Sequence, residues 1–491
     1  MEKENQNELK RSLTMSLIKG LEKILEENLT RLHMPGHKGG EDFPEILKNN
    51  IQKIDITEIP GSDNLHHAQD IILEAQQRAS KIFGAQRTYF LVNGTTVGIQ
   101  SMILANCQPG DQLLIPRNCH RSVWSALILG DITPIYILPN IHPKTGIDLS
   151  ISPGDVKQKL REHPDIKGAV LTYPTYYGTC SDIEKIREIL HNKNKLLLVD
   201  EAHGAHLALH EKLPLSALQG GADIVVDSTH KILSSFTQSS MLHVGNKNIS
   251  IEKLEMFLGM LQSSSPSYPL MASLDWAAQQ AAKVGYQKWE EIIQWTHQAR
   301  EAIHTYTNMR VMDEKIIGQY EVADYDLGKI LVDVSPIELT GIEVEEILRR
   351  EYKVQVELSD YHHVLAMTGM GTTKEDIQRF TRAIIDIDHK YGNSHKKLPI
   401  IPMGYLKEKV ALSPRKAIYS SYEEIPLKCA QDRISKEFII PYPPGIPMVL
   451  PGEIITKEII EFIDQIQKSG GTIIGPQDYQ LKNIRVVKYK K

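Results

Sequence analysis

The chain has 491 residues, of which 41% are hydrophobic and 24% charged, and its formal net charge is −5. This length exceeds one average domain, so we expect two or three, and the lack of a basic excess argues against nucleic acid as the main partner. No apolar run reaches the ~18 residues of a membrane-spanning helix, the first residues are polar rather than signal-like, and the four cysteines lack CxxC spacing, which fits a reducing cytoplasm without zinc knuckles or disulfides.

The first part of the chain contains a predicted helix and two polar loops. Apolar residues recur at helical spacing within residues 5–30, and this helix could pack on its own core or on a second subunit. Residues 31–40 follow as a Pro/Gly-rich loop that carries His33 and His37. The Pro-Gly pair between the two histidines excludes the helical spacing of a zinc site, so we expect no metal there and a loop that faces a substrate or cofactor. Residues 55–65 form the second loop.

A glycine and two threonines follow the predicted strand at residues 88–92. Gly94, Thr95 and Thr96 stand where this strand turns into a helix. Backbone N–H groups and hydroxyls at such a turn can bind a phosphate. The glycine spacing is neither that of a Walker motif nor that of a Rossmann motif, and an ordinary capped helix start is the alternative.

His120 follows the next predicted strand, at residues 111–116. Its ring could stack on a flat heterocycle, or it could be a capping or core histidine. A further strand at residues 169–173 ends in a Pro/Gly loop, and a helix at residues 182–192 leads to the strand after it. Strands and helices thus alternate from about 85 to 245, which predicts a mostly parallel sheet covered by helices.

An aspartate and a lysine end two successive predicted strands. Asp200 ends a leucine-rich strand. Lys231 comes after the strand at residues 222–226, and Ser228 and His230 precede it in the sequence. Ligands gather at the carboxyl ends of such strands. A buried lysine has a lowered pKa and can form a Schiff base, while an aspartate can keep a pyridine nitrogen protonated. The pair indicates pyridoxal 5'-phosphate; the alternatives are a helix-cap aspartate and a lysine that extends to water.

The pattern changes after about residue 310. Residues 271–306 predict a long helix, and the strands at 326–334 and 352–358 with helices at 343–350 and 373–390 predict a small α+β domain. We therefore expect four parts: an N-terminal helix and loop (1–38), a cofactor-binding large domain (39–308), a small α+β domain (309–392) and a C-terminal domain (393–491), the last beginning in a polar linker at 391–397.

Taken together, these motifs resemble the fold-type-I pyridoxal-phosphate decarboxylases of basic amino acids, the bacterial Orn/Lys/Arg decarboxylase family. The resemblance extends from about residue 8 to 480 and implies an aspartate-aminotransferase-like α/β large domain with small α+β and C-terminal domains. The chain lacks the response-regulator-like N-terminal part of the long, acid-induced members and is most similar to the short, biosynthetic arginine decarboxylases. The resemblance rests on HMPGHKGG (33–40), TEIPGSDNL (57–65), FLVNGTT (90–96), VDEAHGAH (199–206), DSTHKILSSFTQ (227–238), SSPSYPLMASLD (264–275) and YPPGIPMVLPGE (442–453).

The resemblance also implies roles for individual residues. Lys231 would bind the cofactor aldehyde, Asp200 would pair with the pyridinium nitrogen, and His120 would stack on the ring. The serine loop at 263–265, where family members often have threonine, would reach the phosphate of the partner subunit, which implies a homodimer or larger assembly with the active site at its interface. The other implied contacts of the cofactor are Gly94, Thr95, Thr96, His203, Ser228, His230 and Ser264.

The implied reaction is decarboxylation of a basic L-amino acid, namely arginine to agmatine and CO2 in polyamine biosynthesis. Lys231 or His230 would return a proton to Cα. The cationic end of the substrate needs an acidic partner, for which Glu357, Asp360 and Glu58 are candidates. Lysine and ornithine are alternative substrates within the family, since the depth of a pocket depends on folded geometry.

Two readings from other classes compete with this one. A metal-dependent hydrolase would use His33, His37, Asp200 and His203 and predicts bound metal without yellow colour. A cofactor-free binding protein would leave Asp200 and Lys231 unexplained.

Overall fold

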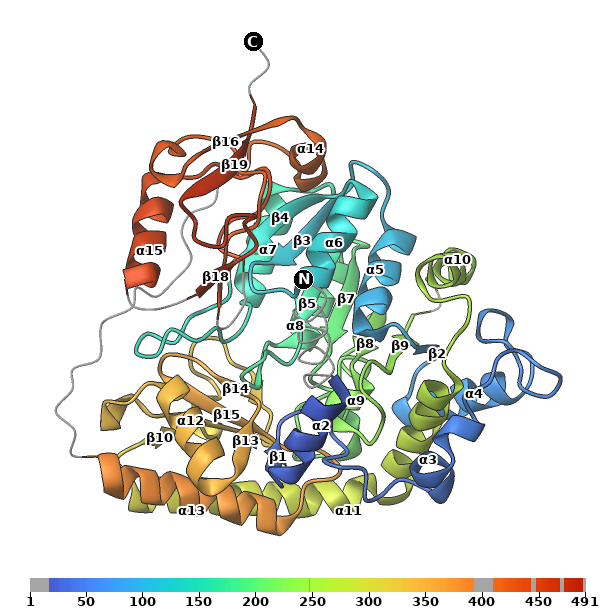
Figure 1. Ribbon diagram of the computed structural model, residues 1–491. Coiled ribbons are helices and arrows are strands. Elements are labelled where there is room, and N and C mark those ends of the chain that lie inside the picture. Colours follow the sequence, from blue (N-terminus) through green and yellow to red (C-terminus); the bar gives the residue numbers. More distant parts are fainter. Residues whose placement is uncertain (1–16, 247, 393–408, 443–446, 469–471, 489–491) are drawn as a thin grey trace, which may run out of the picture.

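The structure is a computed structural model that describes residues 17–246, 248–392, 409–442, 447–468 and 472–488 (Figure 1). The predicted N-terminal helix appears as α2 (Leu17–Glu26). The rest of its pattern, residues 5–16, lies outside the described residues, as do residues 393–397 of the predicted linker. No helix in the described ranges is long and apolar enough to cross a membrane.

A seven-stranded sheet lies at the centre of the molecule, with the strand order β2-β9-β8-β7-β5-β3-β4 (Figure 1). β4, β3, β5, β7 and β8 run parallel to one another, and β9 runs antiparallel to both of its neighbours. The predicted mostly parallel sheet is therefore confirmed. The strands are β2 (Arg87–Leu91), β3 (Gln112–Pro116), β4 (Thr133–Ile137), β5 (Ile166–Thr172), β7 (Leu196–Glu201), β8 (Ile224–Asp227) and β9 (Ser240–Val244).

Helices cover both faces of this sheet, which explains why its strands read as continuous apolar runs. Leu197 and Val199 of β7 pack in one hydrophobic cluster, and Leu198 between them packs in another, as the alternation of side chains along a strand requires. The first cluster includes α4 (Ile71–Phe83), α7 (Pro153–Glu162), α8 (Ile183–His191) and α11 (Tyr268–Tyr306), and the second α5 (Gly94–Asn106), α6 (Arg121–Gly130) and α10 (Ile251–Leu261).

The predicted small α+β region forms a four-stranded antiparallel sheet, in the order β10-β12-β15-β14, with two helices. The strand predicted at 352–358 is divided in the structure, because β13 pairs in parallel with β1 near the N-terminus and only β14 joins the small sheet. The elements are β1 (Thr30–Leu32), β10 (Arg310–Val311), β12 (Lys329–Asp333), α12 (Gly341–Tyr352), β13 (Val354–Val356), β14 (Leu358–Ser359), β15 (His363–Met367) and α13 (Lys374–Tyr391). The domain boundaries themselves stay a prediction.

The C-terminal part has its own hydrophobic cluster and lies beside β3 and β4, in red in Figure 1. Arg117, which directly follows β3, joins it to the central sheet, because its guanidinium donates to both carboxylate oxygens of buried Glu453 at 2.6 and 2.8 Å. Its elements are α14 (Pro414–Tyr419), β16 (Tyr422–Pro426), β17 (Ile440–Tyr442), α15 (Lys457–Lys468), β18 (Thr472–Ile474) and β19 (Asn483–Val487).

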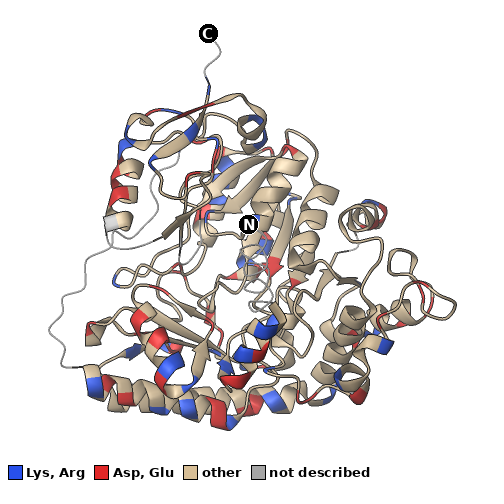
Figure 2. Ribbon diagram, viewed as in Figure 1, with Lys and Arg blue, Asp and Glu red and all other residues tan. Residues whose placement is uncertain are grey.

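Charged residues of both signs are mixed along the outer helices. Figure 2 shows Lys and Arg interspersed with Asp and Glu on α12 and α13, at the bottom of the view. This mixture matches the small net charge of −5. Other short elements are α3 (Glu45–Asn49), β6 (Thr179–Cys180), α9 (Thr229–Ile232) and β11 (Asp324–Tyr325).

Candidate active site

Asp200 and Lys231 lie at the carboxyl ends of two neighbouring strands. Asp200 is 2% exposed near the end of β7 and is in register with Val226 of β8. β8 leads through Ser228 into the short helix α9, which carries Lys231. Because parallel strands end at one edge of a sheet, the two side chains reach the same site.

Burial changes the protonation of both groups. Burial raises the pKa of Asp200 to about 6. Two smaller effects lower this pKa, namely the charge of Lys231 and a hydrogen bond of 3.1 Å from the N–H of Ala202 to the Asp200 carboxylate. Burial also lowers the pKa of Lys231, although the negative charges of Asp200 and Glu357 raise it in part. A lower pKa leaves more of this lysine as the neutral, nucleophilic amine.

Three histidines surround the lysine. His203 Nε2 lies 3.0 Å from Lys231 Nζ, and the buried Nδ1 of His203 has no hydrogen-bond partner among the described residues. His230 is buried, and its Nδ1 lies 2.7 Å from the carbonyl of Ser239. His120 caps the start of α6 by accepting from the N–H of Ser122 at 3.3 Å. Its stacking on a cofactor ring stays a prediction. Desolvation and the charge of Lys231 lower the pKa of His120 to about 4, and the residue keeps an exposed face.

The predicted phosphate turn joins this site through hydroxyl groups. Gly94, the first residue of α5, has φ +77°, a conformation that favours glycine. Thr95 is buried, and its hydroxyl contacts those of Ser228 and Ser240, the latter at 2.9 Å. Thr96 is exposed. The start of α5 and the segment before α9 are therefore linked directly.

The serine loop lies beside the same turn. The N–H of Ser263 donates to the side-chain oxygen of Asn93, the residue before α5, at 3.0 Å. His66 Nε2 lies 2.8 Å from the Ser263 carbonyl. Ser264 is exposed. These contacts are within one chain, so the predicted role of Ser264 in a partner subunit stays a prediction.

The loop at residues 33–40 packs its backbone against α9. The N–H of Gly36 donates to the carbonyl of His230 at 2.7 Å, and the Gly36 carbonyl accepts from the N–H of Gly371 at 2.9 Å. A Cβ at Gly36 would lie 2.2 Å from the carbonyl carbon of Ile232, so this close approach requires glycine. The loop thereby fixes the position of the helix that carries Lys231.

The histidines of this loop make local contacts. His33 Nδ1 lies 2.5 Å from the carbonyl of Met34, and His37 Nδ1 accepts from the N–H of Gly39 at 3.1 Å. Over the described ranges, no group of three or more His, Cys, Asp or Glu side chains is placed to hold a metal ion.

The lysine of the same loop is buried. Lys38 donates to the carbonyl of Met367 at 2.9 Å, and burial lowers its pKa to about 7.

Of the three acidic candidates, the structure brings Glu357 to the site. Its carboxylate accepts from the N–H of Met34 at 2.7 Å and from the hydroxyl of Tyr176 at 2.8 Å, and it remains partly exposed. Its charge raises the pKa of Lys231. Asp360 is engaged elsewhere, with His363 Nδ1 at 2.9 Å. Glu58 is exposed in its loop.

Two residues of the site region are absent from the sequence-based set. Tyr176 packs its ring edge-on against His203 at a centroid distance of 4.7 Å. Lys329 is 0% exposed and donates to the carbonyls of Thr175 and Tyr176. Both have a signal in the sequence: Tyr176 follows the carboxyl end of a predicted strand, and Lys329 directly precedes the apolar run Ile330–Val332.

Comparison with known proteins places these motifs in one family. The chain matches the major domain of the Orn/Lys/Arg decarboxylases over residues 15–327 and their C-terminal domain over residues 405–475. It is 38% identical to an arginine decarboxylase of Bacillus anthracis over 477 residues, which are 95% of this chain and 96% of that protein. It is also 38% identical to an arginine decarboxylase of Bacillus subtilis strain 168 over 97% of this chain and 98% of that protein.

Solved structures share the fold. The crystal structure of the Francisella novicida lysine decarboxylase LdcF is similar with a TM-score of 0.79 and 22% sequence identity, covering 92% of this chain and 78% of that chain. At this identity the likeness concerns the fold alone. The α/β architecture with a mostly parallel sheet is therefore that of a known decarboxylase.

Proposed function

The chain belongs to the Orn/Lys/Arg decarboxylase family, and on that premise we propose that it decarboxylates L-arginine to agmatine and CO2 with pyridoxal 5'-phosphate as its cofactor. The observation that carries the chemistry is the pairing of buried Asp200 with a lysine of lowered pKa at one edge of the sheet. The 38% identity to the Bacillus arginine decarboxylases supports arginine as the substrate. Family membership also favours this reaction over the metal-dependent hydrolase and the cofactor-free binding protein.

The residues at the sheet edge fit the proposed cofactor. Asp200 supplies a buried carboxylate, which is the kind of anionic partner that a protonated ring nitrogen would need. His203 Nδ1 is buried and has no hydrogen-bond partner in the described part of the chain, and a bound polar molecule would satisfy it. Gly94, Thr95 and Ser228 offer a turn and hydroxyl groups for a phosphate. We propose these residues as its contacts, with Thr96, His120, His230 and, from a partner subunit, Ser264.

When bound, pyridoxal phosphate supplies an electron-accepting ring that takes up the electron pair left as CO2 departs. Asp200, with its pKa of about 6, is mostly ionised at neutral pH and can hold a proton on the ring nitrogen. Lys231 supplies the amine, and His203 Nε2, 3.0 Å from Lys231 Nζ, can hydrogen-bond to that amine and orient it. Lys231 and His230 are the proposed donors of the proton that returns to Cα.

We propose that Glu357 binds the cationic end of the substrate. Its carboxylate is partly exposed and is held in place by two donors, Met34 N–H and the Tyr176 hydroxyl. Two donors leave lone pairs available on the carboxylate, and a guanidinium can donate to them in a forked geometry. An ammonium would bind as a point charge with less directional preference.

We place this reaction in cytoplasmic polyamine biosynthesis, in a homodimer or larger assembly with its active site at the subunit interface. The exposed serine loop beside Asn93 supports the interface proposal, because a second copy could cover it. Size determination of the purified protein tests the assembly.

One experiment tests cofactor and substrate together. The purified protein is examined by visible absorption before and after addition of L-arginine, L-lysine or L-ornithine, while CO2 release is followed. A yellow band that changes with arginine as CO2 appears is the expected result. A yellow protein that responds only to lysine or ornithine would move the substrate assignment within the family, and a colourless protein that added cofactor cannot restore would overturn the account of Lys231.

A further inference from the structure

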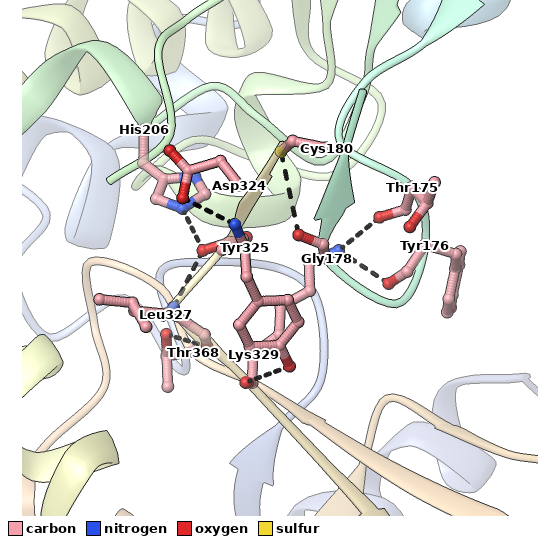
Figure 3. A network of polar contacts seen from close by, with 12 residues as sticks. Thr175, Tyr176, Gly178, Cys180, His206, Asp324, Tyr325, Leu327, Lys329 and Thr368 are labelled. Carbon is pink, nitrogen blue, oxygen red and sulfur yellow. Dashed lines mark hydrogen bonds and ion pairs between the residues drawn. The ribbon is translucent and has the colours of Figure 1, made fainter. Parts of the chain in front are cut away.

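Lys329 is a buried lysine beneath the turn that carries Tyr176. It is the first residue of β12 and is 0% exposed. Its Nζ donates to the carbonyl of Tyr176 at 2.8 Å and to that of Thr175 at 3.3 Å (Figure 3). The same Nζ lies 5.8 Å from the centroid of the Tyr176 ring. Burying an ammonium group is costly unless it is hydrogen-bonded and paired with a negative charge, so this position depends on its neighbours.

Asp326 supplies the negative charge. It is fully buried, and its carboxylate raises the pKa of Lys329. One carboxylate oxygen lies 3.0 Å from His206 Nε2 and accepts from the N–H of Gly328 at 2.9 Å. His206 stacks on Trp289 at a centroid distance of 4.1 Å. The charge that balances Lys329 is therefore anchored to the large-domain core.

Lys329 and Asp326 hold the same turn from both ends. The N–H of Asp326 donates to the Gly178 carbonyl at 2.8 Å, while Lys329 holds the carbonyls of Thr175 and Tyr176. Gly178 has φ +100°, and a Cβ there would lie 3.2 Å from Lys329 Cδ. The aliphatic part of the lysine thus fills the space under the turn, and its ammonium donates to the carbonyls of Thr175 and Tyr176.

The turn places Tyr176 between two residues of the proposed active site. Its ring packs edge-on against His203 at 4.7 Å, and His203 in turn lies 3.0 Å from Lys231 Nζ. Its hydroxyl donates to Glu357 at 2.8 Å. The side chain that contacts both groups is thus attached to a backbone segment held by Lys329.

We infer that Lys329 is a positioning residue of the active site, which holds Tyr176 against His203 and Glu357 through the carbonyls of residues 175 and 176. The catalytic part of this inference rests on the proposed decarboxylation. The geometric part, that Lys329 orders the turn, does not depend on it.

The charges agree with this role. Burial and the charge of Lys231 lower the pKa of Lys329 to about 8, so at neutral pH the group is mostly protonated and keeps its strong, charge-assisted hydrogen bonds. Its positive charge is also among the causes that lower the pKa of His203, after burial and the charge of Lys231. Lys329 therefore helps to keep His203 neutral beside Lys231.

The test compares Lys329→Met with a matched control, Lys288→Met. Lys288 has the same kinds of contact, since it donates to the carbonyl of Thr372 at 2.7 Å and lies 5.2 Å from the Trp295 ring centroid. Amide hydrogen exchange is measured in both variants and in the unaltered protein, together with KM, kcat and cofactor content. We expect exchange within residues 173–180 to be ~10-fold faster in Lys329→Met alone, because two charge-assisted hydrogen bonds are lost.

We also expect KM to rise ~10-fold in Lys329→Met while cofactor content stays unchanged, since the phosphate turn is not touched. In a background of Tyr176→Phe, which lacks the hydroxyl bonded to Glu357, the same substitution should raise KM less than threefold, as residues that act through one contact are not additive. Unchanged exchange at residues 173–180, or equal acceleration throughout the chain, would overturn the inference.

Two further outcomes are decisive. If Lys329→Met does not fold, Lys329→Gln, which keeps a donor without the charge, is judged by the same criteria. If neither folds while Lys288→Met does, Lys329 has a purely structural role and the inference fails. If the unaltered protein decarboxylates no basic amino acid, the proposed function fails, whereas the exchange data still decide whether Lys329 orders the turn.

Discussion

Lys231 Nζ lies 3.0 Å from His203 Nε2, and both groups are deprived of water. Burial lowers the pKa of each, so neither is readily charged in the presence of the other. A neutral amine can attack an aldehyde. The pair thus places an uncharged nucleophile beside an uncharged ring nitrogen that can hydrogen-bond to it and orient it.

Lys231→Ala is expected to abolish turnover, with a loss of at least ~10³-fold, because the nucleophile is removed. Borohydride reduction followed by mass spectrometry should find the cofactor attached to residue 231 in the unaltered protein and nowhere in the variant. Lys185→Ala, at an exposed lysine paired with Asp182, is the control and should keep full activity. Normal turnover in Lys231→Ala would contradict the assignment.

Asp200 should make the cofactor-free protein less stable as pH rises. Burial raises its pKa from 3.8 to about 6, so the folded state binds a proton more tightly than the unfolded state. The stabilisation is complete below about pH 4 and is lost as pH rises through 6. The shift of about two units corresponds to about 3 kcal/mol of unfolding free energy. Urea titrations from pH 4 to 7 should therefore show that the unfolding free energy of the unaltered protein falls relative to that of Asp200→Asn. If the two unfolding free energies changed in parallel with pH, this account would be refuted.

Glu357→Gln is expected to raise KM for the basic substrate by ~10- to 100-fold, because a charged partner of the substrate's cation is replaced by a neutral one. The amide oxygen can still accept from Met34 or Tyr176, so cofactor content and stability should change little. Steady-state kinetics with spectroscopic measurement of bound cofactor make the comparison. Glu58→Gln, at an exposed loop carboxylate, is the control. An unchanged KM in Glu357→Gln would exclude the proposed contact.

Gly36→Ala should displace α9 and weaken cofactor binding. The added Cβ would lie 2.2 Å from both the carbonyl carbon and oxygen of Ile232, which neither backbone can accommodate without moving. We expect a loss of at least ~2 kcal/mol in unfolding free energy and a lower cofactor content. Gly20→Ala in α2, where no atom of the described residues lies within 4 Å of the added Cβ, should be neutral or slightly stabilising. Equal stability of the two variants would show that the contact between loop and α9 is unimportant.

Local sequence rules predict the centre of this site well. Asp200 and Lys231 are 31 positions apart (231 − 200), and parallel strands with a crossover bring the ends of successive strands to one edge whatever their side chains contact. The predicted phosphate turn at Gly94 is likewise a strand-to-helix turn with glycine and hydroxyls. The fold class follows from the same alternation of strands and helices.

The rim of the site depends on contacts between distant segments. Glu357 meets Met34 across 323 positions, and Lys329 meets Tyr176 across 153. No periodicity relates such residues, because the packing of the small α+β region against the large sheet brings them together. The sequence offers three acidic candidates for binding the cationic end of the substrate and does not rank them, because only the folded geometry distinguishes Glu357 from Asp360 and Glu58.

Arg117→Met should detach the C-terminal part from the central sheet. Arg117 and Glu453 are buried, and removal of one partner leaves an uncompensated charge, which costs about 3–5 kcal/mol. Urea unfolding and limited proteolysis measure the effect, and we expect earlier cleavage in residues 409–488. The double variant Arg117→Met/Glu453→Met should recover much of the loss, because a buried ion pair replaced by apolar side chains is often close to neutral.

The exposed pair Arg87–Glu255 provides the control for this effect. Arg87→Met should cost less than ~1 kcal/mol, because water already screens both charges. Arg117 also lies three positions before His120 on the same loop, so its loss should disturb His120 and reduce cofactor content as well as stability. If Arg117→Met cost no more than Arg87→Met and retained its cofactor, the buried pair would be irrelevant both to the docking of the C-terminal part and to the placement of His120.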